Sequence, residues 1–272
     1  MRSMSAHAKI NLALVVGPLR ADGKHDVVTV LQHIELSDRI TLSAGERLSV
    51  SGFAGDTIVA HALESLATFA RVEPKWSVEI AKSIPVAAGL GGGSTDAACA
   101  LRLANALLAA PLESSQLDEL AATIGADVPF FLRSGPHLGT GDGATLVPVD
   151  VPQGFRIVLV LPNDEVKAST RDVYEAFDAR GGASGFATRR ADLLGALAAV
   201  RIDADLARLP SNDLAESPVS ELLLEAGAFR ADVSGAGPTV YGLFEDHRAA
   251  DAAALALQSV GRTWVTAPVT PA

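Results

Sequence analysis

Cysteine is almost absent from this chain, because Cys99 is the only one among 272 residues. A single thiol excludes an internal disulfide and a cysteine-based zinc cluster, and its place in an apolar stretch predicts a buried structural residue. The chain also lacks an apolar run of about 18 residues, the length that spans a membrane. Residues 1–7 lack the apolar core of a signal peptide. We therefore expect a cytoplasmic protein that has no membrane partner.

The chain has no surplus of basic residues. It contains 22 Lys and Arg against 32 Asp and Glu, a net charge of −10. A nucleic-acid surface needs clustered basic side chains, so this balance argues against a nucleic-acid partner. It leaves a phosphate ligand open, since backbone N–H groups and a few cations suffice to bind one. The content of 49% hydrophobic and 20% charged residues is typical of a globular protein long enough for one large or two ordinary domains.

What the chain does have is a glycine loop, with Gly89, Gly91, Gly92 and Gly93 within five positions. Residues 76–81 before it are predicted to form a strand, and an apolar run, residues 97–110, predicts a helix after it. Ser94 is a natural N-cap for that helix. A glycine-rich backbone that ends at a helix N-terminus favours a bound phosphate. A flexible linker is the alternative, but it does not explain why the helix starts so sharply.

The spacing of this loop excludes two common nucleotide-binding motifs. A Walker A loop needs a lysine directly after its last glycine, and no lysine follows Gly93. A dinucleotide-binding fingerprint needs a third glycine where Ser94 stands. The loop therefore belongs to another class of phosphate site.

Before the loop, the pattern predicts strands and one helix. Residues 6–17 alternate as in a half-buried strand, which places Lys9 and Asn11 together on the face opposite the aliphatic row. An ordinary surface strand explains these two residues equally well. Strands at 27–36 and 39–42 are separated by a predicted turn at Ser37–Asp38, and residues 56–71 predict an amphipathic helix.

After the loop and its helix, residues 114–124 predict a further helix. Asp127 then lies between a helix stop, Gly125, and an apolar run. Such an acid either caps the next turn or serves as a functional carboxylate, and the local pattern alone favours the cap. Residues 139–143 predict a glycine-rich hairpin.

The second half predicts an α+β layer with an antiparallel sheet. Its expected strands are residues 155–161, 230–233, 239–244 and 263–268, and its helices include 169–180 and 247–260. A domain boundary is expected near the prolines and glycine of residues 148–154, which gives domains of residues 1–152 and 153–272.

Five separated segments together resemble the GHMP small-molecule kinases over nearly the whole chain. In order, they are Ala8–Asn11, Arg20–His25, Gly89–Ser94, Gly125–Pro129 and Ser234–Pro238. The resemblance implies a two-domain fold, with an N-terminal domain like domain 2 of ribosomal protein S5 and a ferredoxin-like C-terminal domain.

The resemblance also implies ATP-dependent phosphorylation of a small-molecule alcohol with Mg²⁺. It is strongest to the members that act on a diphosphocytidyl substrate in isoprenoid precursor synthesis. A homoserine or mevalonate type of GHMP kinase is the alternative. An S5-like RNA-binding module is a third, but this acidic chain lacks the basic surface it needs.

Matching this chain to the family's motifs implies a set of site residues. Lys9 and Asp127 become the catalytic pair, and Ser94 the hydroxyl nearest the metal. The implied ATP-binding residues are Asp56, Lys82, Pro85, Gly89, Leu90, Gly91, Gly92, Gly93, Ser94 and Thr95. The implied substrate-binding residues are Asn11, Lys24, His25, Thr170, Tyr174, Gly235 and Gly237.

One of these positions departs from the family pattern. Lys24 stands where the family usually has an aromatic residue that stacks on the cytosine. His25 can still hydrogen-bond the base edge, and Tyr174 matches the position of a second stacking aromatic. We therefore expect the cytosine to be held by a modified set of contacts.

Overall fold

The structure, a computed structural model, describes residues 1–163 and 169–269. Within these residues no helix is both long and apolar enough to cross a membrane. Its strands are β1 (Arg2–Leu19), β2 (His25–Ala44), β3 (Ser49–Ser51), β4 (Trp76–Ala81), β5 (His137–Gly141), β6 (Thr145–Pro148), β7 (Arg156–Pro162), β8 (Arg230–Val233), β9 (Val240–Phe244) and β10 (Gly261–Thr266). Its α-helices are α1 (Ile58–Ala70), α2 (Gly92–Asn105), α3 (Ser114–Ile124), α4 (Val128–Phe131), α5 (Thr170–Ala179), α6 (Phe186–Ala199), α7 (Val219–Glu225) and α8 (His247–Ala256), with 3-10 turns at Asp203–Arg208 and Leu257–Ser259.

The chain forms two compact units, each built from several segments. The first comprises residues 1–8, 36–86 and 91–134, and the second comprises residues 9–35, 87–90 and 135–272. The predicted domain boundary between residues 152 and 153 stays a prediction.

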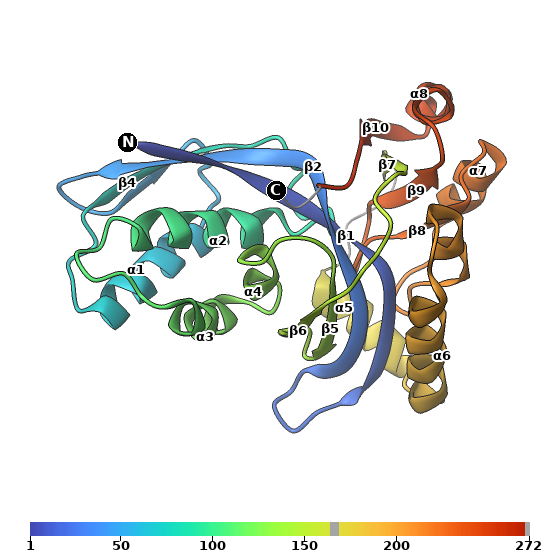
Figure 1. The fold of residues 1–272 in the computed structure, drawn as a ribbon, viewed down its shortest axis with the longest axis horizontal. Coiled ribbons are helices and arrows are strands. Elements are labelled where there is room, and N and C mark those ends of the chain that lie inside the picture. Colours follow the sequence, from blue (N-terminus) through green and yellow to red (C-terminus); the bar gives the residue numbers. More distant parts are fainter. Residues whose placement is uncertain (164–168, 270–272) are drawn as a thin grey trace. The chain divides into compact units, whose positions relative to one another are not determined.

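In the first unit, helices pack beside a small sheet. The second half of β2 pairs antiparallel with β4, and β3 pairs parallel with β4. Helices α1 and α2 pack on each other, and α2 also packs on β4 (Figure 1). The apolar stripe of α1, which includes Ala62 and Leu66, is buried as its helical period predicts. This packing fixes α2, the helix that follows the glycine loop.

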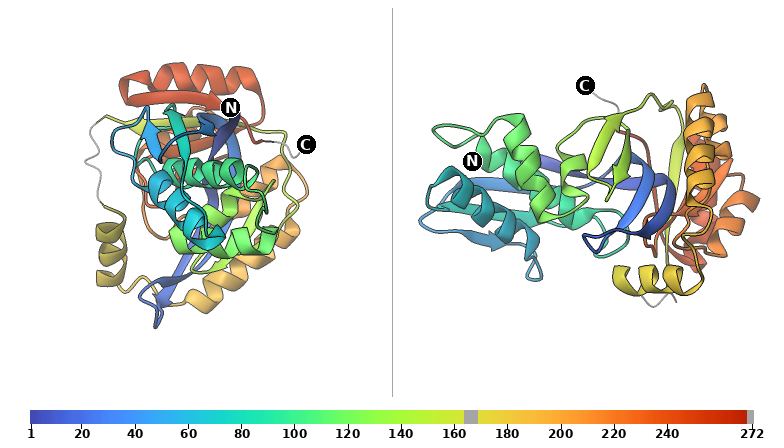
Figure 2. Two further views of the ribbon diagram at one scale, coloured as in Figure 1. Left: turned by 90° about the vertical axis from the view of Figure 1, so that its left-hand side faces the viewer. Right: turned by 90° about the horizontal axis from the view of Figure 1, so that it is seen from below.

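The second unit contains a four-stranded antiparallel sheet in the order β10-β7-β9-β8. Helix α8 packs along this sheet against β7 and β10, and α7 packs against β8 and β9 (Figure 2). Buried Val160, Phe244 and Leu257 belong to the core between them. The antiparallel layer predicted for the second half of the sequence is therefore confirmed.

The predicted turn at Ser37–Asp38 is wrong, because β2 runs unbroken from His25 to Ala44. Asp38 is 1% exposed, and its Oδ1 accepts hydrogen bonds from the backbone N–H groups of Ser83 (2.5 Å) and Ile84 (2.8 Å). A serine followed by an aspartate is typical of a turn when those side chains face water. Here a partner 45 residues away satisfies the carboxylate inside the protein, so the strand continues.

Candidate active site

On β1, Lys9 and Asn11 share one face, as the alternation predicts, yet both are buried, at 4% and 5% exposure. The Lys9 Nζ donates to Asn11 Oδ1 at 2.6 Å, and Asn11 Nδ2 donates to Thr29 Oγ1 at 2.8 Å. Thr29 in turn donates to the carbonyl of Ala13. The surface-strand alternative for Lys9 and Asn11 is therefore wrong, because a surface strand needs no such buried chain of hydrogen bonds.

The glycine loop has a backbone suited to an anion. Positive φ angles occur at Ala87 (56°), Gly89 (78°) and Gly91 (72°), and not at the residues between them. Alternation of this kind turns successive N–H groups into one concavity. A positive φ is strained for an alanine, so the surroundings must hold the loop in place.

Three hydrogen bonds hold the first part of this loop. The carbonyls of Ala88, Gly89 and Leu90 accept, respectively, from Thr239 N (3.3 Å), Ser234 Oγ (3.0 Å) and Lys9 N (3.0 Å). Because these three carbonyls are hydrogen-bonded to other parts of the protein, the first part of the loop is anchored. The flexible-linker alternative is therefore wrong.

Helix α2 begins at Gly92, and Gly91 occupies the N-cap position. Ser94 is thus the third residue of the helix, and its prediction as N-cap is wrong, because the left-handed φ of Gly91 lets the helix start three residues earlier. The N–H groups of the first turn have no partner within a helix, so they form its positive end. A Cβ atom on Gly92 would lie 3.2 Å from Lys82 Nζ, which places that ammonium beside the first turn.

Two carboxylates hold Lys82 there. Its Nζ lies 2.5 Å from Asp38 Oδ2 and 2.9 Å from Asp96 Oδ2. Burial lowers the pKa of Lys82, but the hydrogen bonds to both carboxylates outweigh it and the net pKa is raised. Burial raises the pKa of Asp96 to about 7, against the opposing hydrogen bond from Lys82. The sequence pattern missed Asp38, because nothing local to residue 38 points to partners at residues 82–84, just after β4.

The turn between β8 and β9 lies beside Lys9 and Asn11. Gly235 and Gly237 have positive φ angles of 60° and 76°. A Cβ on Gly235 would lie 3.3 Å from Lys9 Nζ and 3.4 Å from Asn11 Oδ1. Three residues from two distant motifs are thus brought together, and the absence of a side chain at Gly235 lets the turn approach the lysine and the amide closely.

A second group forms around His25, the buried first residue of β2. Its ring lies 4.9 Å from that of Tyr174 in an edge-on geometry, and its Nε2 is 3.2 Å from Asp178 Oδ1. Among the described residues, nothing hydrogen-bonds to its buried Nδ1. Thr170 is the exposed first residue of α5, one turn before Tyr174.

Lys24, the departure from the family pattern, is paired. Its Nζ lies 2.6 Å from Asp142 Oδ2 in the turn between β5 and β6, and both side chains are partly exposed. Burial raises the pKa of Asp142, but the hydrogen bond from Lys24 outweighs it and the net pKa is lowered. The ion pair joins two turns, so the ammonium already has a counter-charge.

The remaining predicted residues lie at helix starts or in the loop. Asp127 directly precedes α4, yet its side chain makes no capping hydrogen bond to that described helix, which argues against the cap interpretation. Asp56 does cap a helix, because its carboxylate accepts from the N–H groups of Val59 (3.2 Å) and Ala60 (3.3 Å) in α1. Pro85 precedes the glycine loop, and Leu90 lies within it, between Gly89 and Gly91. Thr95 is buried in the first turns of α2.

Comparison with known proteins gives consistent results. The model of the "GHMP kinases N terminal domain" family matches residues 57–135, and that of the "GHMP kinases C terminal" family matches residues 186–263. A 4-diphosphocytidyl-2-C-methyl-D-erythritol kinase from Anaeromyxobacter dehalogenans is 39% identical over 93% of this chain and 84% of that relative. One from Geobacter metallireducens is 34% identical over 97% of each chain. A crystal structure of 4-(cytidine 5'-diphospho)-2C-methyl-D-erythritol kinase superimposes with a TM-score of 0.80 at 29% identity, over 99% of this chain and 100% of that one.

Proposed function

Since the chain belongs to the GHMP kinase family, among the 4-diphosphocytidyl-2-C-methyl-D-erythritol kinases, we propose that it phosphorylates the 2-hydroxyl of 4-diphosphocytidyl-2-C-methyl-D-erythritol in isoprenoid precursor synthesis. Its fold is the two-domain α+β GHMP kinase fold predicted from the sequence. The observation that carries the proposal is the 34–39% identity to relatives of that name over almost the entire chain.

ATP is the phosphate donor of this family, and we assign its phosphates to the loop from Gly89 to Thr95. The alternating φ angles and the open first turn of α2 support this assignment. Lys82, held beside Gly92 by Asp38 and Asp96, supplies a fixed positive charge near the same turn. Phosphoryl transfer depends mainly on positioning and charge neutralisation, and these groups provide both.

The proposed acceptor contacts come from two groups of residues. We assign Asn11, Gly235 and Gly237 to the first group, because Gly235 closely approaches Lys9 and Asn11, which are hydrogen-bonded to each other. The unpartnered Nδ1 of His25, with Tyr174 edge-on beside it, suits the hydrogen-bonding edge and face of a cytosine. Thr170 and Lys24 lie close to this second group in sequence, and we assign them to the rim.

In the proposed reaction, the acceptor hydroxyl oxygen forms a bond to the γ-phosphorus of ATP, and the bond from that phosphorus to the β–γ bridging oxygen breaks, releasing ADP. The hydroxyl proton goes to the Asp127 carboxylate, which makes no capping hydrogen bond to the described helix α4. The ammonium of Lys9, oriented by Asn11 at 2.6 Å, stabilises the charge on the transferring group.

Mg²⁺ is proposed as the accompanying metal. Among the described residues no cluster of three or more His, Cys, Asp or Glu side chains forms a metal cage. This fits magnesium, which is usually held by substrate phosphates and waters with only one or two protein oxygens. The hydroxyl of Ser94, in the first turn of α2, is the protein oxygen we assign to it. When bound, the ion would neutralise phosphate charge.

The test is ATP-dependent phosphorylation with a panel of acceptors: the diphosphocytidyl compound, homoserine and mevalonate, each with Mg²⁺. Transfer to the diphosphocytidyl compound, with the new phosphate on the 2-hydroxyl by ³¹P NMR, is the expected result. Transfer to homoserine or mevalonate instead would refute the proposed acceptor and leave a GHMP kinase of the alternative type.

The role of Asp127 has its own test. Asp127→Asn keeps the shape and removes the charge, so kcat is expected to fall by about 100-fold or more while KM changes little. Asp118→Asn is the matched control, because it makes the same change at a partly exposed ion pair with Arg133 in the same unit. A change confined to KM would rule out the catalytic role.

A further inference from the structure

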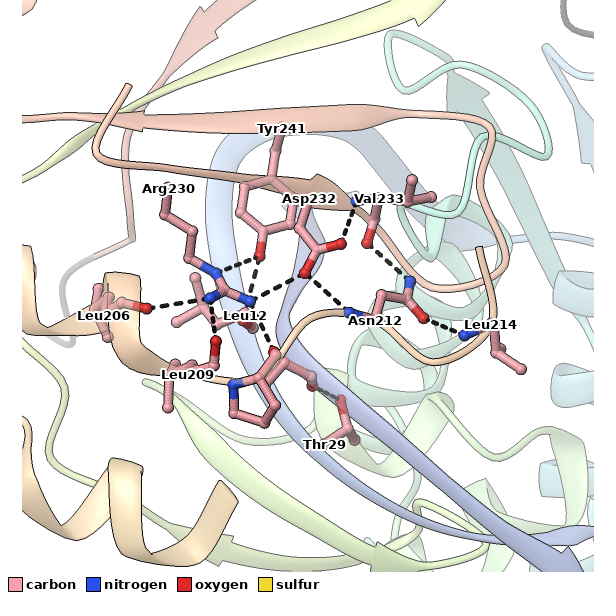
Figure 3. A network of polar contacts seen from close by, with 12 residues as sticks. Leu12, Thr29, Leu206, Leu209, Asn212, Leu214, Arg230, Asp232, Val233 and Tyr241 are labelled. Atoms are coloured by element: carbon pink, nitrogen blue, oxygen red, sulfur yellow. Dashed lines mark hydrogen bonds and ion pairs between the residues drawn. The ribbon is translucent and has the colours of Figure 1, made fainter. Parts of the chain in front are cut away.

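A buried polar network in the second unit joins β1, β8 and β9 to the segment of residues 206–214 (Figure 3). At its centre, Arg230 is 6% exposed, and its guanidinium donates to Tyr241 Oη (3.2 Å) and to Asp232 Oδ2 (3.0 Å). It also donates to the main-chain carbonyls of Leu206, Leu209 and Pro210. A buried guanidinium with so many partners holds the strands β8 and β9 and the segment 206–210 in one arrangement.

The network has one end on β1. The hydroxyl of fully buried Tyr241 donates to the carbonyl of Leu12 at 3.2 Å. Burial raises the pKa of Tyr241 to about 12, so this hydroxyl keeps the proton that it donates. Leu12 directly follows Asn11 on β1. The hydrogen bond from Tyr241 therefore fixes the position of β1 next to the residues that carry the Lys9 and Asn11 side chains.

The other end is on the turn between β8 and β9. Asn212 is 5% exposed, and its main-chain N–H donates to Asp232 Oδ2 at 3.0 Å. Its side-chain amide donates to the carbonyls of Gly235 (2.7 Å) and Val233 (2.9 Å) and accepts from Leu214 N (2.8 Å). Both N–H groups of the Asn212 amide thus donate to this region, one to the end of β8 at Val233 and one to the turn at Gly235, which lies beside Lys9.

We propose that Asn212 and Arg230 are positioning residues for the kinase reaction. Through hydrogen bonds to Gly235, Val233 and Tyr241, they hold the β8–β9 turn and β1 at the close spacing seen at Gly235, where a Cβ would lie 3.3 Å from Lys9 Nζ and 3.4 Å from Asn11 Oδ1. A buried ion pair often adds little net stability compared with an apolar replacement. We therefore infer that the network serves to fix the positions of the β8–β9 turn and β1. This inference rests on the proposed function.

The first test is kinetic. Asn212→Ala removes both bonds to the strand end and the turn, and kcat/KM for the diphosphocytidyl acceptor is expected to fall by about tenfold or more. Leu223→Ala is the control, because Leu223 is fully buried in the core formed by the β7–β10 sheet with α7 and α8 and is expected to lower stability without touching the turn. Both variants are assayed well below their melting temperatures. An equal loss of kcat/KM in Leu223→Ala, or none in Asn212→Ala, overturns the proposal.

The second test does not depend on the acceptor. Amide hydrogen exchange at residues 234–237 is expected to be at least about tenfold faster in Asn212→Ala than in wild type, and unchanged in Leu223→Ala. Unchanged exchange in Asn212→Ala refutes the positioning role even if the protein phosphorylates a different acceptor. If Asn212→Ala does not fold, Arg230→Lys takes its place, since it keeps the charge but loses the fork that contacts the three carbonyls.

Discussion

Gly89 is the position in the glycine loop where a single added methyl group should have the largest effect. Its φ is 78°, and a Cβ there would overlap the carbonyl oxygen of Ser234 and lie 3.0 Å from that of Gly237. Gly89→Ala therefore combines two penalties: a left-handed backbone for an alanine and a clash with main chain that cannot rotate away.

The two penalties can be separated. Gly227 has a φ of 99° and open space around the position of a Cβ, so Gly227→Ala has the backbone penalty alone. That penalty is about 1–2 kcal/mol, reduced by about 0.4–1 kcal/mol because alanine also restricts the unfolded chain. In Gly89→Ala the loop must also move away from the turn at Ser234. It would then lose or weaken the hydrogen bonds to the carbonyls of Ala88 and Gly89, worth about 1 kcal/mol each.

The expected loss in the free energy of unfolding is therefore about 1 kcal/mol for Gly227→Ala and about 3 kcal/mol for Gly89→Ala. At about 2 °C per kcal/mol for a chain of this size, the melting temperature falls by about 2 °C and about 6 °C, respectively. The displaced loop should also raise the dissociation constant of ADP at least about tenfold, which is 1.4 kcal/mol. Thermal unfolding and calorimetric titration with ADP measure both quantities. Equal values for the two variants in both assays would refute the contact between Gly89 and the turn and the role of the loop together.

Three further predictions concern other residues. Lys24→Tyr should leave KM for the acceptor unchanged or lower it. The Lys24 ammonium already has Asp142 as counter-charge, and an aromatic ring can stack on a base. A higher KM would mean that Lys24 itself contacts the acceptor. Because burial raises the pKa of Asp96 to about 7 from 3.8, the folded protein keeps a proton that the unfolded chain releases, and this contribution to stability is lost as pH rises through 7. Asp96→Asn should therefore reduce the fall in unfolding free energy between pH 5 and pH 8, and an unchanged slope in urea titrations would contradict this. Burial raises the pKa of Cys99 to about 12, so the native protein should not react with a thiol reagent at pH 8. The urea-unfolded chain should react with one equivalent of the reagent. Rapid labelling of the native protein would contradict this and show that the Cys99 thiol is accessible.

Local patterns were enough to predict several elements. The alternation in residues 6–17, the helical period of residues 56–71 and the glycine hairpin at 139–143 all correspond to observed elements. Each depends on residues within a few positions of one another, whose spacing is set by the covalent chain. The glycine loop was predictable for the same reason, since closely spaced glycines before a helix allow the positive φ angles that such a loop needs.

The same patterns gave wrong details where several conformations or environments fit the same local sequence. Ser94 has the chemistry of an N-cap, but the helix starts at Gly92 because Gly91 takes the left-handed conformation. Lys9 and Asn11 alternate as on a surface strand, but other elements of the fold bury both of them. Local chemistry ranks the available conformations, and packing chooses among them.

By itself, the sequence determined many of the strands and helices, the place of the glycine loop before a helix and the family to which the chain belongs, because these depend on short motifs. Only the tertiary structure decided that Asp38 meets Lys82 across 44 positions, that Ser234 meets Gly89 across 145, and that Asn212 holds Gly235. The physical reason is that a hydrogen bond between distant segments depends on where the whole chain packs, and neither partner carries a local signal of the other.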